Sequence, residues 1–174
     1  MLFLVSCEND VAEVEQISSK KLGVEEARQV EIIYTLTGHT KSILKAPLMY
    51  RVQDSIPYIE FPRTIHVDFY NPLGQKESKL DALYARYKET QSLIYIRDSV
   101  RVINMLEGDT LICEELFWDQ NRRGREFYTD KPVRIRTPTQ VIDGIGMESG
   151  QDFKNWSIKH PRGNIQVPAS SFPE

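Results

Sequence analysis

The chain has 174 residues, which suffices for one domain with a sizeable core. Its net charge is −3, with both signs interspersed and no basic stripe that would neutralise phosphates, so the composition argues against a nucleic-acid partner. Charge by itself therefore identifies no ligand.

The N-terminal residues resemble a lipoprotein leader. MLFLVS is an apolar run that ends in a small residue, and the chain turns polar directly after Cys7. Leu-Val-Ser-Cys resembles a bacterial lipobox, in which signal peptidase cleaves before a cysteine that carries a diacylglycerol. We expect residues 1–6 to be part of a signal peptide whose start lies upstream, because six residues cannot supply both its charged and its apolar region. Cys7 would then be lipidated, which leaves no pair for a disulfide within the chain, and residues 7–28 would form a polar tether. The alternative is a free cysteine in an apolar tail.

After this tether, apolar residues recur at every second position, which is the period of a half-buried strand. The pattern predicts strands at 30–34, 44–52, 58–61 and 65–70. Pro47 predicts an edge position or a bulge, because proline cannot donate a hydrogen bond to a neighbouring strand.

The segment from Ser78 to Tyr87 carries conflicting signals. Its apolar residues fall at helical spacing, and Ser78 with Asp81 could form a capping box. The segment lies between strands, however, and an isolated helix of about ten residues is marginal without a docking surface. We therefore predict a strand.

The central stretch from Leu93 to Asp119 predicts a β-hairpin. Ile94, Ile96, Val100 and Val102 alternate with polar residues, a loop containing Gly108 follows, and a second apolar run begins directly afterwards. We expect this hairpin to cover an apolar interior.

The remaining chain continues the β pattern. It predicts strands near 126–136, 141–147, 156–158 and 165–167, with glycines in the second of them that permit a bend. The expected result is a single all-β domain over residues 29–168 made of antiparallel strands, with a loose tail at 169–174.

No grouping of residues indicates catalysis or a cofactor. The three histidines, His39, His66 and His160, lack metal-site spacing. Glu114, Glu115 and Asp119 could supply paired carboxylates for glycoside hydrolysis, although a wet strand face explains them more simply. We expect no enzyme activity, metal or cofactor.

The resemblance to a known family rests on four segments: the predicted hairpin at 111–118, the segment at 78–87, the run Tyr-Thr-Asp-Lys-Pro-Val-Arg-Ile at 128–135 and Gly-Ile-Gly-Met at 144–147. Together these resemble the LptC family of lipopolysaccharide-export proteins, in its Bacteroidetes-type form, over about residues 30–167. The resemblance implies a twisted, boat-like β-jellyroll of two antiparallel sheets. Familiar members have a transmembrane helix, whereas this chain looks lipidated at Cys7.

The same resemblance implies a non-enzymatic carrier. It would receive lipopolysaccharide from an inner-membrane ABC transporter and pass it to an LptA-like periplasmic protein of the same fold, by pairing of edge strands. The implied location is the periplasm, with a lipid anchor in the inner membrane. Sheltering an acyl chain of about a dozen carbons is worth roughly 10 kcal/mol, at about 0.8 kcal/mol per methylene.

The residues that the alternation predicts to face the interior are candidates for lining a lipid groove, although an ordinary sandwich core would use the same residues. They are Ile65, Val67, Phe69, Ile94, Ile96, Val100, Val102, Leu111, Cys113, Val133, Ile135 and Met147. A rival interpretation is a surface lipoprotein that binds glycan or protein through exposed aromatic residues such as Tyr70, Tyr95 and Trp118.

Overall fold

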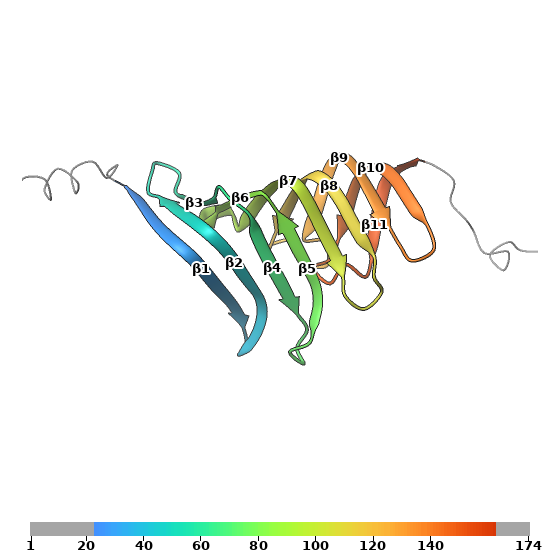
Figure 1. The fold of residues 1–174 in the computed structure, drawn as a ribbon, viewed down its shortest axis with the longest axis horizontal. Helices are drawn as coiled ribbons and strands as arrows, with labels where there is room; N and C mark the ends of the chain where they lie inside the picture. The colour runs from blue at the N-terminus through green and yellow to red at the C-terminus, as the bar shows by residue number, and fades with distance from the viewer. Residues whose placement is uncertain (1–22, 163–174) are drawn as a thin grey trace, which may run out of the picture.

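The computed structural model describes residues 23–162 and is built from β-strands with one short 3-10 turn (Figure 1). The elements are β1 (Val24–Leu36), β2 (His39–Val52), β3 (Tyr58–Phe61), β4 (Ile65–Tyr70), β5 (Lys76–Ala82), β6 (Tyr84–Lys88), η1 (Glu89–Gln91), β7 (Leu93–Asn104), β8 (Thr110–Asp119), β9 (Phe127–Arg136), β10 (Val141–Ser149) and β11 (Trp156–Arg162). All pairings between neighbouring strands are antiparallel. The all-β jellyroll expected from the sequence is confirmed.

The two layers of the jellyroll share their long strands. The front layer consists of β4, β5 and the strand segments that continue their pairing, at 30–36, 39–46, 100–104, 110–113, 132–136, 141–145 and 160–162. The back layer consists of β3, β6 and the segments at 24–28, 48–52, 93–97, 115–119, 127–129, 147–149 and 156–158. Hydrogen bonds thus connect all the strands into one sheet that is folded over on itself.

The fold line is marked by local breaks in the pairing. Gln29 in β1, Asp98 and Ser99 in β7, and Gly146 in β10 have positive φ angles of 51°, 66°, 55° and 74°. The pairing shifts register beside two of these places, at Asp98 and Ser99 in the β7–β8 pairing and at Gly146 in the β9–β10 pairing, and such bulges bend a strand and increase its twist. Pro47 lies opposite Gln29 in β2, at a gap in the β1–β2 pairing that has no register shift, so the bulge expected as one of two possibilities is not seen at this position.

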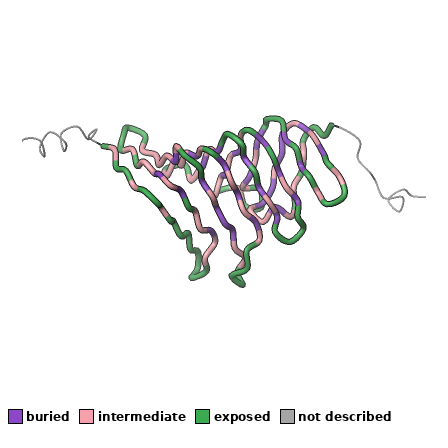
Figure 2. Tube along the Cα trace, viewed as in Figure 1, coloured by how far each residue is buried: buried purple, intermediate pink, exposed green. Residues whose placement is uncertain are grey.

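The core lies between the two layers (Figure 2). Strand alternation sends every second residue of each front-layer strand inward, and pairing aligns the apolar residues across the sheet. The best-aligned row is Ile32, Leu44, Val67, Leu80, Val102, Leu111, Ile135 and Ile142. Phe69 of the front layer meets two aromatic rings of the back layer edge to face, so the layers pack directly on each other.

The strand prediction for Ser78 to Tyr87 is confirmed, because this segment contains the end of β5 and most of β6. Leu83 explains the misleading helical spacing. It is 49% exposed and lies where the chain crosses from the front to the back layer, so it belongs to neither buried row.

Two boundaries differ from expectation. β1 begins at Val24, so residues 24–28, expected in the tether, belong to the sheet and pair with β2. β11 continues through Pro161 to Arg162 instead of ending near Ile158, since an edge strand tolerates proline. Cys7, the predicted strand at 165–167 and the predicted tail lie outside the described residues. Within residues 23–162, no helix is long and apolar enough to cross a membrane.

Candidate functional site: an apolar groove between the layers

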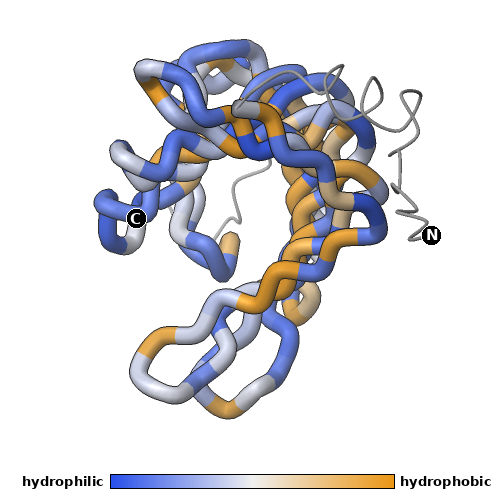
Figure 3. Tube along the Cα trace, turned by 90° about the vertical axis from the view of Figure 1, so that its left-hand side faces the viewer, coloured by the Kyte–Doolittle hydropathy of each residue, from blue (hydrophilic) through white to orange (hydrophobic). Residues whose placement is uncertain are grey.

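An apolar groove of about 270 Å³ lies between the layers at the β1 end of the molecule. Its front wall comes from β1 and β2, and its back wall comes from β3, β6, β7 and β8. Figure 3, viewed from this end, shows the chain curving around the interior. The lining residues are Ile32, Tyr34, Ser42, Leu44, Ile59, Phe61, Tyr87, Glu89, Ile94, Trp118 and Gln120.

Cross-strand pairing assembles each wall. Ile32 lies opposite Leu44 on the front wall, and both project inward because the next residues along each strand project outward. On the back wall, Tyr87 lies between Ile59 on one side and Ile94 on the other. The two polar lining residues beyond the strand ends, Glu89 and Gln120, give the groove a hydrophilic margin.

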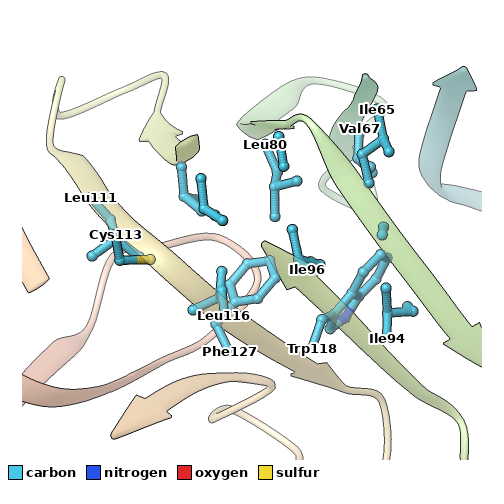
Figure 4. Packing of buried hydrophobic residues seen from close by; sticks show 14 of the residues in the cluster. Ile65, Val67, Leu80, Ile94, Ile96, Leu111, Cys113, Leu116, Trp118 and Phe127 are labelled. Carbon is cyan, nitrogen blue, oxygen red and sulfur yellow. The ribbon is translucent and has the colours of Figure 1, made fainter. Parts of the chain in front are cut away.

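Trp118 lines the groove and also belongs to the buried core cluster, in which Figure 4 labels it together with Phe127. The ring centroids of Phe69 and Trp118 are 5.0 Å apart, and those of Phe69 and Phe127 are 5.6 Å apart, both in edge-to-face arrangements. Such contacts add to the stabilisation from area burial. The indole nitrogen of Trp118 is buried and has no hydrogen-bond partner in the described part of the chain.

The opposite end of the molecule is closed by the loop between β10 and β11. The side-chain amide of Asn104 donates to the backbone carbonyls of Asp152 and Phe153, at 3.3 and 3.2 Å. The Ser78 hydroxyl donates to the carbonyl of Gln151. Phe153 is fully buried, so the loop also contributes to the core.

Two charged contacts reinforce this closure. The Trp156 indole N–H donates to Asp109 at 2.9 Å, and the Lys154 ammonium lies 3.1 Å from Glu77. Glu77 lies in β5 of the front layer, and Asp109 lies in the turn between β7 and β8. Each contact therefore joins the front-layer side to the β10–β11 region. These contacts join the two layers near β11, where Asp109, Lys154 and Trp156 also line a pocket of about 530 Å³, whereas the apolar groove lies near β1.

The twelve predicted groove residues are all buried, with exposed fractions of at most 6%. All twelve lie in the core cluster, and of the twelve only Ile94 also lines the groove near β1. The sequence prediction missed most of the actual lining, including Ile32, Leu44, Ile59 and Tyr87. The same alternation contains these residues, but it does not show how well each is covered.

The exposed-aromatic rival is wrong about Trp118, which is 4% exposed and faces the interior. Tyr95 does lie on the outer face, where it donates a hydrogen bond to Glu115 at 2.8 Å and packs beside Phe117. Phe117 in turn stacks on Tyr128 at 5.2 Å. The aromatic rings of this outer face therefore contact one another.

The candidate carboxylates have separate local partners. Glu115 accepts the hydrogen bond from Tyr95, whereas Asp119 accepts one from the backbone N–H of Asn121. His66 lies between Asp68 and Asp81, with ring nitrogens 3.0 and 2.6 Å from their oxygens. Within residues 23–162, no group of three or more His, Cys, Asp or Glu side chains is arranged so that it could hold a metal ion.

Comparison with protein-family models matches residues 14–160 to LptC: Lipopolysaccharide-assembly, LptC-related. The match extends from before β1 into β11 and thus includes nearly all of the described fold. A search of curated proteins finds no match.

Proposed function

Because the chain belongs to the LptC-related family of lipopolysaccharide-assembly proteins, we propose that it carries lipopolysaccharide by sheltering an acyl chain in the groove near β1. Family membership supports a role in lipopolysaccharide transport as a bridge component and not as an enzyme. The observation that carries the finer proposal is the apolar groove between two layers that are otherwise packed together.

The driving force is removal of methylene groups from water. Each buried methylene contributes about 0.8 kcal/mol, and this gain needs no directional contact. The groove offers Ile32, Leu44, Ile59 and Ile94 as apolar contacts from both layers. Ile32 is 38% exposed, so part of this apolar surface faces solvent until something covers it. A carrier needs only such a surface. The energy that moves lipopolysaccharide would come from ATP used by the transporter.

The closed core suggests how longer acyl chains could be sheltered. The predicted groove residues other than Ile94 would line an extension of the groove if the layers separated towards β11. Such separation would have to break the edge-to-face contacts of Phe69 with Trp118 and Phe127.

The proposed partners follow the family resemblance. An inner-membrane ABC transporter would deliver lipopolysaccharide, and an LptA-like periplasmic protein would receive it by pairing with an edge strand. β1 and β11 are the edges of the described sheet, and each pairs with a single neighbour there. A lipid on Cys7 would hold the protein at the periplasmic side of the inner membrane.

Neighbouring residues on one strand test the groove. Ile32 faces the groove, whereas the adjacent Ile33, which is 55% exposed, faces the opposite side of β1. A photo-crosslinking amino acid at Ile32 should trap lipopolysaccharide in cells, and the same group at Ile33 should trap much less. Equal labelling at both positions, or none at Ile32, would refute carriage in this groove.

The rival function predicts a different outcome. A glycan-binding or protein-binding lipoprotein that uses the outer aromatic face would lose its ligand when Tyr95 is replaced by alanine. The carrier should retain lipopolysaccharide crosslinking at Ile32 after that change, since Tyr95 lies outside the groove.

A further inference from the structure

Two hydrogen-bonding residues lie at the end of the apolar groove away from β1, which we call its inner end. Trp118 is on β8, the last strand of the back wall, and Ser42 is on β2, the last strand of the front wall. Their exposed fractions are only 4% and 5%. Buried hydrogen-bonding groups carry a cost in free energy unless they have partners, so a partner is expected for each.

The Trp118 indole lacks such a partner. Its nitrogen is buried, and it has no hydrogen-bond partner among residues 23–162. The ring packs against Phe69 and Phe127, with centroids 5.0 and 5.9 Å away, and neither ring offers an oxygen. The other tryptophan, Trp156, donates its indole N–H to Asp109 at 2.9 Å. The same fold therefore contains one indole with a polar partner and one without.

The Ser42 hydroxyl belongs to the same end of the groove, on the opposite wall. Ser42 pairs with Phe69 across the front layer, and the Phe69 ring meets the Trp118 ring edge to face. Phe69 therefore adjoins both polar residues. A serine hydroxyl supplies one donor and two acceptor lone pairs, and it rotates to reach its partner. The inner end thus combines a fixed donor with an adaptable hydroxyl.

The chemistry of the lining defines the ligand. Among the described residues that line the groove, only Glu89 is charged, and it is paired with Arg51 at the margin. The inner end therefore has no charge that would hold an ionised group. The aliphatic residues of both walls favour a chain of methylene groups. An indole N–H only donates, whereas a serine hydroxyl both donates and accepts. The complementary group is an uncharged oxygen on an apolar chain, and a hydroxyl satisfies both protein groups at once.

We propose that the inner end of the groove binds a hydroxyl carried by an acyl chain, which accepts a hydrogen bond from the Trp118 indole and donates one to Ser42. The indole turns towards the groove to reach this oxygen, since its nitrogen is otherwise buried. The groove thereby distinguishes a hydroxylated chain from a plain chain of equal length, which leaves both groups unpaired. This inference rests on the proposed function and specifies the kind of acyl chain that the groove prefers.

Competition between matched lipids tests the preference. The competitors are methyl esters of one saturated fatty acid, either unsubstituted or with a hydroxyl on one carbon, and they displace a fluorescent acyl-chain probe from the full chain carrying Cys7→Ser. A hydroxyl at the carbon that meets Trp118 should strengthen binding by roughly fivefold over the unsubstituted ester. Hydroxyls at other carbons should weaken binding, because they lie against the apolar lining without a partner.

Changes at the two polar residues should remove the preference and retain lipid binding. Replacing Trp118 by benzothienylalanine keeps the fused rings that pack on Phe69 but substitutes sulfur for the N–H. This variant should bind the hydroxylated and unsubstituted esters equally, and Ser42→Ala should reduce the preference. Ser157→Ala changes an exposed serine of β11 outside the groove, so it is the control and should keep the preference. Urea unfolding checks that each variant is folded.

The indole signals in a proton–nitrogen correlation spectrum report the hydrogen bond directly. The chain contains two tryptophans, and Trp156 is an internal reference because its N–H is already bonded to Asp109. In the parent, the hydroxylated ester should move the Trp118 signal downfield relative to the unsubstituted ester. The Trp156 signal should stay in place with both esters.

Equal binding of the esters at every hydroxyl position, or a Trp118 signal that responds alike to both kinds of ester, would overturn the hydroxyl site and leave lipid carriage standing. Failure of the probe to bind, or of every ester to displace it, would overturn carriage in this groove as well.

Discussion

The side-chain amide of Asn104, at the end of β7, donates a 3.2 Å hydrogen bond to the backbone carbonyl of Phe153, which lies between β10 and β11. Asn104 belongs to the front layer, whereas the segment that contains Phe153 follows the back-layer part of β10. Both residues are fully buried. This contact ties the folded sheet shut on the side away from its fold line and leaves the apolar groove at the other end of the molecule.

Replacing Asn104 by alanine should destabilise the fold by about 2–3 kcal/mol. The change leaves the carbonyls of Asp152 and Phe153 without their donor, and it removes the oxygen that accepts from the N–H groups of Leu106 and Glu107. Urea denaturation measures the loss. Asn121→Ala, which removes a side chain bonded at an exposed site, should cost less than about 1 kcal/mol. Equal losses would show that Asn104 does not hold the layers together.

Filling the groove should weaken lipid binding without unfolding the protein. Leu44→Trp places a larger side chain on the front wall and should displace about two methylenes of a bound chain, which corresponds to roughly tenfold weaker binding. A fluorescent acyl-chain probe measures this affinity. Ile43→Trp, on the opposite face of the same strand, is the control and should bind the probe like the parent. The same loss in both variants would argue against the groove as the binding site.

The thiol of Cys113 should be unreactive in the folded protein. Burial raises its pKa to about 12, so only about one molecule in ten thousand carries the thiolate at pH 8. In the Cys7→Ser background, a thiol reagent should label Cys113 rapidly in guanidinium chloride and very slowly in native buffer. Rapid labelling in native buffer would mean that the front layer opens without global unfolding.

The free energy of unfolding should depend on pH through the ionisation of Glu148. The Arg122 side chain, which donates to it at 2.8 Å, is the main cause that lowers the pKa of Glu148 below its ordinary value of 4.5, and Arg125 adds to the effect at 3.0 Å. A carboxyl group with a lowered folded-state pKa stabilises the protein above the ordinary value, and this contribution is lost as the pH falls through the folded pKa.

Glu148→Gln should therefore lower the free energy of unfolding by about 1–2 kcal/mol at pH 7, and the difference from the parent should shrink below about pH 4.5. Urea denaturation across this pH range measures the difference. A difference that stayed constant down to pH 3 would contradict the role assigned to the two arginines.

The sequence by itself determined the strands and the family. Alternation over Ile65 to Tyr70 is local information, because successive side chains of a strand point to opposite faces whatever the strand packs against. The four segments that resemble LptC-related proteins were sufficient to indicate the fold and a role in lipopolysaccharide transport, and the family match supports both. The segment at 78–87 was ambiguous because its spacing combines two strands and the crossing between them.

Only the tertiary structure decided which inward-facing residues are available to a ligand. Ile94 and Ile96 point to the same face of β7, yet Ile94 lines the groove, whereas Ile96 is fully enclosed. Side chains of the opposite layer cover each inward-facing residue, and which side chains reach it depends on where the sheet folds. Asp98 and Ser99 mark that fold in β7 with positive φ angles but without a glycine to reveal it. The ion pairs on the outer face of the front layer likewise need the register of the strands: Glu31 and Lys45, or Asp81 and Arg101, are distant in sequence and become neighbours only through pairing.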